Sequence, residues 1–171
     1  MKIHIVGGSG SGKTTLAKQL AETYGLSHVD LDEFQWDNSG SYGVRRPEEE
    51  RNALLAAAVS EENWVNEGVY YAWVEPSFQK ADLIVFLKTP LWLCRFRVIR
   101  RFFRRKLGKE SGKKESLSSL WALLRWMGRY KKKNEKEIGT LLEKFGGKVL
   151  VTKSADPFSL VKERLSCYNK V

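Results

Sequence analysis

The chain has 171 residues, which fits one domain with its own core, and its 42% hydrophobic content includes no uninterrupted apolar run near 18 residues. We therefore expect no membrane-spanning segment and a single soluble domain over residues 1–171. The net charge of +10 is concentrated between residues 95 and 136, where 16 Lys and Arg against three acids give +13, a segment suited to polyphosphate, nucleic acid or an anionic membrane.

The first expected element is a short apolar strand over residues 2–6, followed by a glycine-rich loop and a helix over about 12–24. The loop fits the pattern G-x-x-x-x-G-K-[ST] at every fixed position. Its glycines let backbone N–H groups approach phosphate oxygens, Lys13 adds a cation for the β- and γ-phosphates, and the Thr14 hydroxyl can ligate Mg²⁺. The sequence therefore predicts a site for ATP and Mg²⁺, with the nucleotide-binding residues Gly7, Gly8, Ser9, Gly10, Ser11, Gly12, Lys13, Thr14 and Thr15.

The rest of the chain alternates expected strands and helices. Apolar runs predict strands over about 27–30, 64–68, 83–87 and 148–151. Helical patterns cover about 47–60, 90–106, 117–145 and 156–168, with a break in the third near Gly139, and turn or loop chemistry covers 37–43 and 107–116. This alternation, with the phosphate loop after the first strand, predicts a doubly wound α/β fold.

The phosphate loop and the acidic turn after the second strand resemble those of the small-molecule kinases related to adenylate and shikimate kinase. Residues 31–36 (Leu-Asp-Glu-Phe-Gln-Trp) resemble the L-D-x-hydrophobic-x-W stretch of one branch, usually labelled DNA topology modulation protein (FlaR-related). Residues 64–70 and 81–87 resemble the third and fourth strands of that branch. The resemblance implies a P-loop NTPase fold with three α/β/α layers, a five-stranded parallel sheet in the order 2-3-1-4-5, an acceptor-binding segment at about 33–75 and a basic helical lid at about 97–130.

One position departs from this resemblance. Nucleoside monophosphate kinases carry an arginine four residues after the acid that ends strand three, and here that position is Tyr71. A monophosphate acceptor would have to be held by Arg45, by Arg46 or by the lid.

Three acids are candidates for the reaction. Asp30 and Asp32 point the same way at a strand end, and shikimate-kinase-like enzymes use such a pair for a Mg²⁺-bound water and for the acceptor hydroxyl. We assign Asp30 to the metal and Asp32 to the acceptor hydroxyl, with the alternative that one of them caps the next helix. By resemblance Glu67 holds a water of the Mg²⁺ shell, unless it is a solvated carboxylate, so the expected metal set is Thr14, Asp30 and Glu67.

The basic segment offers arginines at helical spacing. Arg97, Arg101 and Arg104 share one helix face. By resemblance Arg97 lies against the adenine and Arg101 on the phosphates, although a solvated basic face is the alternative. The expected catalytic set is therefore Lys13, Asp32 and Arg101. Arg125 and Arg129 form a second pair, on an amphipathic helix that we expect to pack on the core rather than to lie on a membrane.

These residues predict an ATP-dependent phosphotransferase that uses Mg²⁺ and acts on a small metabolite such as a nucleoside, nucleotide or sugar-like alcohol. The alternative is a nucleotide-binding regulator that binds nucleic acid through the basic segment. We expect no membrane partner, and the oligomeric state stays open. Because a strand is predicted at the first residues, we expect no cleavable signal peptide. The two cysteines match no metal or redox spacing, and we therefore expect a cytoplasmic location.

Overall fold

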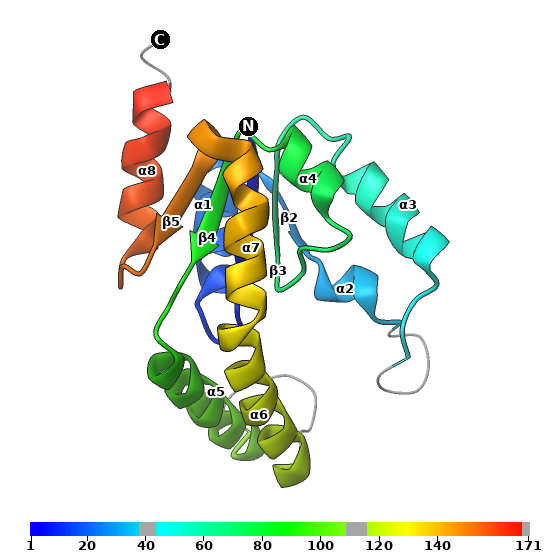
Figure 1. Cartoon of the computed structure of the whole chain (residues 1–171), viewed down its shortest axis with the longest axis vertical. Coiled ribbons are helices and arrows are strands. Elements are labelled where there is room, and N and C mark those ends of the chain that lie inside the picture. The colour runs from blue at the N-terminus through cyan, green and yellow to red at the C-terminus, as the bar shows by residue number, and fades with distance from the viewer. Residues whose placement is uncertain (38–43, 109–115, 169–171) are drawn as a thin grey trace.

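The computed structural model describes residues 1–37, 44–108 and 116–168, and Figure 1 shows how its elements are arranged. One parallel sheet has the strand order β2-β3-β1-β4-β5, which confirms the predicted order. Parallel neighbours need a crossover between them, and helices supply it here. The strands are β1 (Lys2–Gly7), β2 (Ser27–Asp30), β3 (Trp64–Gly68), β4 (Leu83–Leu87) and β5 (Val149–Thr152).

Helices of different lengths connect these strands. In chain order they are α1 (Lys13–Tyr24), α2 (Asp32–Gln35), α3 (Glu48–Ala58), α4 (Glu75–Lys80), α5 (Leu91–Lys106), α6 (Leu117–Lys132), α7 (Asn134–Leu142) and α8 (Pro157–Tyr168), with the 3-10 helix η1 (Glu143–Lys148) before β5. Neither α2 nor α4 was predicted, because helices of four and six residues are too short to show a periodic pattern. Among the described residues, none of these helices is long and apolar enough to cross a bilayer.

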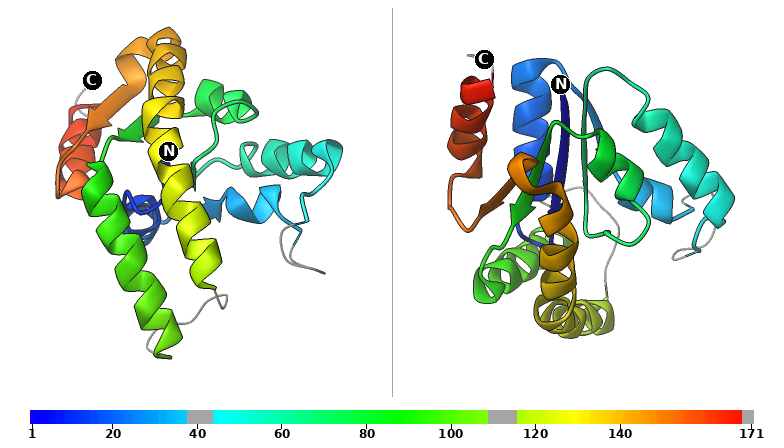
Figure 2. Two further views of the ribbon diagram at one scale, coloured as in Figure 1. Left: turned by 60° about the horizontal axis from the view of Figure 1, so that its bottom comes forward. Right: turned by 45° about the horizontal axis from the view of Figure 1, so that its top comes forward.

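Two apolar clusters fix the three layers. On one face of the sheet, Leu16 and Leu20 of α1 and Val161 of α8 pack on alternate residues of β1 and β4. On the other face, α3, α4 and α7 pack on the intervening residues, with the fully buried Phe78 near the centre. Both faces of the sheet are covered, and the inner strand β4 is apolar throughout, as in buried parallel sheets (Figure 2).

Helices α5 and α6 form a hairpin beyond the carboxyl edge of the sheet, and it carries a third apolar cluster (Figure 1). The long helix expected over 117–145 does break, but the predicted position near Gly139 is wrong. The break lies at Lys133 (φ −102°, ψ −63°), between α6 and α7. The apolar side of α6 faces α5, whereas Ile138 and Leu142 of α7 face the sheet, so the chain changes direction between these two surfaces. The loops expected over 37–43 and 107–116 lie mostly outside the described residues.

A polar group lies deep in the core at His4. Its Nδ1 is 2.8 Å from the Ser77 hydroxyl, and Asn66 donates to the same oxygen at 3.2 Å. Complete burial lowers the pKa of His4 from 6.5 to about 3, because the charged ring would lose its hydration. The folded chain therefore keeps this imidazole neutral at pH values where the unfolded chain protonates it.

We expect this group to make the fold sensitive to acid. Stability falls as the pH drops below 6.5, because only the unfolded state takes up the proton, and the effect ends near the folded pKa of about 3. Between pH 6.5 and 5.5 the loss is at most about 1.4 kcal/mol. Urea unfolding of wild type and His4→Gln at both pH values measures it. The variant should lose that part of the slope, and His28→Gln should change the slope less, since His28 is only half-buried. Equal slopes in wild type and His4→Gln would contradict the assignment.

Candidate functional site

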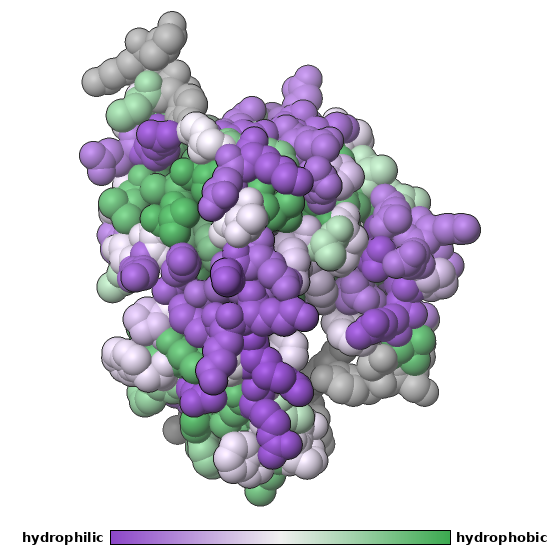
Figure 3. Space-filling view, viewed as in Figure 1, coloured by the Kyte–Doolittle hydropathy of each residue, from purple (hydrophilic) through white to green (hydrophobic). Residues whose placement is uncertain are grey.

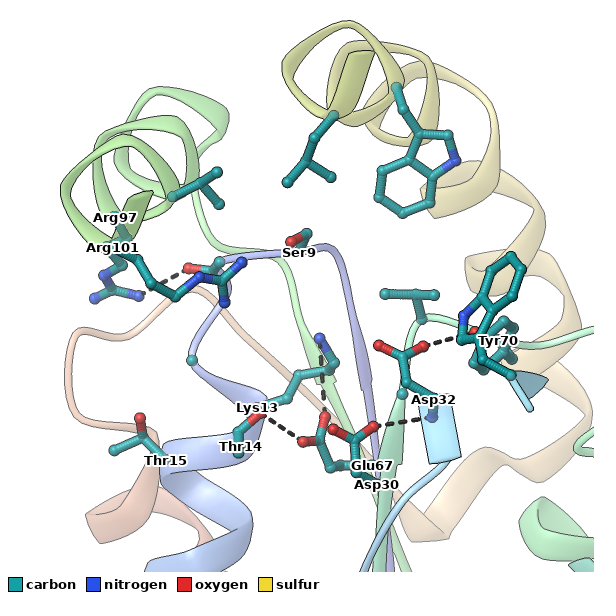
Figure 4. Close-up of a pocket in the computed structure, with 18 of the residues that line it drawn as sticks. Ser9, Lys13, Thr14, Thr15, Asp30, Asp32, Glu67, Tyr70, Arg97 and Arg101 are labelled. Carbon is teal, nitrogen blue, oxygen red and sulfur yellow. Dashed lines mark hydrogen bonds and ion pairs between the residues drawn. The ribbon is translucent and has the colours of Figure 1, made fainter. Parts of the chain in front are cut away.

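A cavity of about 680 Å³ lies at the carboxyl edge of the sheet, beneath the α5–α6 hairpin (Figure 4). Ligands of doubly wound folds bind at this edge. The cavity brings together residues far apart in the chain: the predicted site residues Ser9, Gly10, Gly12, Lys13, Thr14, Thr15, Asp30, Asp32, Glu67, Arg97 and Arg101.

The phosphate loop forms one wall of the cavity. Lys13 Nζ donates to the Gly8 carbonyl at 3.2 Å and lies 3.9 Å from Glu67 Oε2. The N-cap of α1 is Gly12, at φ 101°, and no side chain of the described residues caps this helix. The free N–H groups of the first turn and the Lys13 ammonium therefore offer positive charge to a phosphate group, so this wall fits the triphosphate of ATP.

Glycine is required at two positions of this loop, because a Cβ there would lie too close to a backbone carbonyl of a neighbouring element. A Cβ on Gly10 would lie 2.6 Å from the Cys94 carbonyl of α5, at a φ of +75°. A Cβ on Gly7 would lie 2.9 Å from the Leu87 carbonyl of β4. A Cβ on Gly8 would lie 3.3 Å from the Tyr130 ring of α6, and the Ser11 carbonyl accepts from the Thr89 hydroxyl at 3.0 Å. The loop is thus held closely between β4, α5 and α6.

We expect Gly10→Ala to destabilise the fold by roughly 2–4 kcal/mol, because it adds a backbone clash to the strain of a positive φ. Gly25→Ala is a matched control: Gly25 also has a positive φ, of 65°, but nothing lies within 4 Å of its added Cβ. The control should lose about 1 kcal/mol. Urea unfolding of both variants measures the difference, and equal losses would mean that α5 does not constrain the loop.

Two carboxylates converge beside Thr14. Asp30 is the last residue of β2 and Glu67 the last but one of the neighbouring β3, and the two are paired in register. The Thr14 hydroxyl donates to Glu67 Oε1 at 2.5 Å. Burial raises the pKa of Glu67 and that of Asp30. The Asp30 carboxylate raises the pKa of Glu67 further, the Asp32 carboxylate raises that of Asp30, and Lys13 opposes both shifts. A hydroxyl and two carboxylates are hard oxygen donors, and a cation between them would relieve this repulsion, so the donor set fits Mg²⁺.

Asp32 lies on the opposite side of Asp30 from this group (Figure 4). Its backbone N–H donates to Asp30 Oδ1 at 2.9 Å, so Asp30 forms a turn that leads into α2. The N-cap of α2 is Leu31, without a side-chain capping bond, so neither aspartate has the capping role that was the alternative. The Asp32 carboxylate accepts from the Tyr70 hydroxyl at 2.6 Å. Burial and this hydrogen bond raise the pKa of Tyr70, which keeps it a donor. The two aspartates, two residues apart, therefore face different parts of the cavity.

The arginines of α5 reach the loop from above. Arg97 Nη1 donates to the Ser11 carbonyl at 3.2 Å and lies 3.4 Å from the Gly10 carbonyl. Arg101, one turn further on, also lines the cavity. Arg125 and Arg129 of α6 are exposed, and the cavity lining does not include them. In this structure the Arg97 guanidinium thus binds the loop carbonyls, and Arg97 and Arg101 both line the cavity.

The far wall contains side chains that the sequence assigned only loosely or missed. Trp36 and Arg45 form an isolated antiparallel bridge, with the guanidinium 5.8 Å from the indole centroid. Both line the cavity with Tyr70, inside the expected acceptor-binding segment. Residues 38–43 of that segment lie outside the described residues. Trp126 of α6 completes the wall and was missed, because its place in an amphipathic pattern indicated only core packing.

Comparisons with known proteins agree with this architecture. No protein-family model matches the chain. Two curated proteins do: the uncharacterized protein YqaC of Bacillus subtilis (strain 168), 32% identical over 104 residues, and a cytidylate kinase of Pyrococcus horikoshii, 34% identical over 116 residues. These alignments cover 60% and 58% of this chain, and the chain spans only 57% and 56% of those two proteins.

Among solved structures, shikimate kinase from Acinetobacter baumannii in complex with shikimate superposes with a TM-score of 0.59 and 20% identity. The match covers 99% of this chain and 93% of that one. This chain has the fold of a P-loop kinase. At this identity the likeness establishes the fold, and the reaction has to be argued from the site.

Proposed function

We propose that the protein is an ATP-dependent phosphotransferase that transfers the γ-phosphoryl group to a small metabolite. The observation that carries the proposal is the division of one cavity into two sides. One side holds the phosphate loop with Thr14 and Glu67, and the other holds Asp32 hydrogen-bonded to Tyr70. A donor and an acceptor therefore have separate walls that meet at Lys13, and the similarity to a cytidylate kinase supports the same class of reaction.

In this reaction the chain contributes position and charge. The N–H groups of the loop and of α1 hold the β- and γ-phosphates, and Lys13 follows the transferred group. Asp32 accepts a hydrogen bond from the acceptor hydroxyl and orients its oxygen toward the γ-phosphorus. Arg101 stabilises the charge that spreads over the transferred oxygens. Thr14, Asp30 and Glu67 would hold Mg²⁺ directly or through water, and the bound ion would neutralise the phosphate oxygens.

The acceptor wall supports a flat or ring-shaped alcohol. Trp36, Tyr70 and Trp126 offer aromatic surface. Arg45 supplies a guanidinium to this wall, whereas the position four residues after Glu67, an arginine in nucleoside monophosphate kinases, is Tyr71. Such a wall suits a nucleoside, a nucleotide or a sugar-like alcohol, with Arg45 binding an anionic group if the acceptor carries one.

Three finer assignments belong to the same proposal. Residues at about 33–75 form the acceptor-binding segment, and the basic hairpin at about 97–130 acts as the lid of a single domain over 1–171. The stretch at 31–36 supports membership of the branch labelled DNA topology modulation protein. The activity is placed in the cytoplasm, where ATP is available.

An acceptor screen tests the proposal. Nucleosides, nucleoside monophosphates and sugar-type alcohols are each added to the protein with ATP and Mg²⁺, and ADP release is followed. We expect one class to raise the rate of ADP release well above that of basal hydrolysis. Analysis of the products should find the transferred phosphoryl group on that acceptor. DNA binding with a steep salt dependence, together with no stimulation by any acceptor, would favour the nucleic-acid-binding regulator instead.

A further inference from the structure

Large hydrophobic side chains are exposed on the α5–α6 hairpin. Ten such side chains are exposed among the described residues, and six of them lie on this hairpin or at its helix ends. The six are between 53% and 70% exposed: Trp92, Phe96, Phe103, Leu107, Leu117 and Trp121. A group of this size on one substructure marks an interaction surface rather than scattered surface residues.

On α5 these side chains form a second apolar face. Trp92, Phe96 and Phe103 follow one another at i, i+4 and i+11, which places them on one stripe of the helix. The buried residues Val98 and Phe102 lie on the other side of the same helix and pack against α6. A helix that needed only to pack on the protein would carry one apolar face, so the outer stripe of α5 requires another explanation.

The outer stripe continues onto α6. Leu117 and Trp121 are one turn apart and exposed, whereas Leu120 and Met127 are buried, so only part of this helix packs on the core as expected. Arg95 Nη2 of α5 donates to the Leu124 carbonyl of α6 at 3.3 Å and joins the two helices along this side. In Figure 3 the lower part of the molecule, formed by the hairpin, exposes apolar and near-neutral surface among polar residues. We call the six exposed side chains the outer hydrophobic face.

The surroundings of this face are strongly positive. Helices α5 and α6 carry eleven Lys and Arg between them and no acid. Two copies of the chain joined through this face would bring these like charges together, which opposes a homodimer. The positive charge and the apolar side chains together favour a binding partner with an anionic surface and an apolar interior.

We propose, in place of the expectation of no membrane partner, that the outer hydrophobic face docks on an anionic lipid surface. The aromatic rings and the leucines insert at the level of the headgroups and upper acyl chains, and Arg100 and Lys106, on either flank of the α5 stripe, bind lipid phosphates. Leu107 and Leu117 decide against single-stranded nucleic acid, because aliphatic side chains give bases no ring to stack on. Such a protein lies on a bilayer without spanning it, and the face leaves Arg97 and Arg101 on another side of α5, directed at the cavity.

Vesicle cosedimentation tests the proposal with the full chain. We expect the protein to bind vesicles of phosphatidylcholine with about 30% phosphatidylglycerol, to bind pure phosphatidylcholine much more weakly, and to dissociate as salt is raised. The triple variant Trp92→Ala/Phe96→Ala/Trp121→Ala should bind the anionic vesicles at least about tenfold more weakly. All three residues are exposed, so the variant should keep its circular dichroism spectrum and its ATP affinity.

A matched control removes three exposed hydrophobic residues from other elements. Leu54→Ala/Val151→Ala/Leu160→Ala should bind vesicles as wild type does. Arg100→Gln/Lys106→Gln should lower binding to the anionic vesicles only. Three outcomes would overturn the proposal: no binding to anionic vesicles, equal binding by the two triple variants, or a solution dimer that the Trp92 triple variant dissociates. Binding of a single-stranded oligonucleotide in place of vesicles, through the same side chains, would overturn it as well.

Discussion

Lys13→Ala should reduce ATP turnover roughly a thousandfold or more while leaving the fold intact. The Lys13 ammonium lies beside the phosphate loop in the cavity, and its contacts hold it there: the Gly8 carbonyl on one side and Glu67 on the other. Removing it leaves the transferred oxygens without their mobile counter-charge. Turnover is measured as acceptor-stimulated ADP release, and folding by circular dichroism and urea unfolding.

The control for this variant is Lys18→Ala, an exposed lysine of the same helix α1. It should keep wild-type turnover, which separates loss of the site cation from a general change in charge. If folded Lys13→Ala turned ATP over like wild type, the phosphate loop would not be the site of the reaction.

Asp32→Asn should lower the transfer rate by about 10²–10⁴ while Mg²⁺–ATP affinity stays within a few-fold of wild type. The amide is nearly isosteric but lacks the charge that orients the acceptor hydroxyl. Asp32 faces Tyr70, whereas Asp30 is paired with Glu67 beside Thr14, so the carboxylate that we propose for the acceptor lies apart from those that we propose for the donor. Single-turnover transfer and equilibrium nucleotide binding measure the two effects.

Two variants frame that result. Glu67→Gln should weaken Mg²⁺–ATP binding as well as the rate, since it removes a charge beside Thr14. Tyr70→Phe should cost much less than Asp32→Asn, because it removes only the donor that holds the carboxylate. A collapse of nucleotide affinity in Asp32→Asn would move Asp32 to the metal side and exchange its role with that of Asp30.

The parts of the fold that the sequence predicted best are those with strong local signals. The phosphate loop has a fixed pattern because its backbone must turn back on itself, as the positive φ of Gly10 and Gly12 demonstrates. The continuous apolar run at 83–87 indicated a central strand covered on both faces, and β4 is buried throughout. The sheet order came from the resemblance of the chain to known kinases, since spacing alone does not determine which strands are neighbours.

Features that depend on tertiary contacts were less accessible. The break at Lys133 arises because α6 packs on α5 whereas α7 packs on the sheet. The sequence does not reveal this change of partner, so the predicted position of the break was a glycine instead. Trp121 and Trp126 belong to one amphipathic pattern, yet Trp126 lines the cavity and Trp121 is exposed. A hydropathy pattern identifies the apolar side of a helix. Whether a residue on that side is buried, lines a cavity or is exposed depends on the element that packs beside it.

We expect the apolar cluster of the α5–α6 hairpin to let the molecule unfold at two levels. Cys94, Val98 and Phe102 pack with Leu120 and Met127, apart from the two clusters that cover the sheet. A hairpin with its own small core can open as a unit while the sheet stays folded. Its opening would withdraw Arg97 from the loop carbonyls and remove the Cys94 turn that packs on Gly10, so the nucleotide wall would loosen in the same event. Occupancy of the site and integrity of the hairpin are thus thermodynamically linked, and a bound nucleotide would stabilise a helical pair whose outer side it never touches.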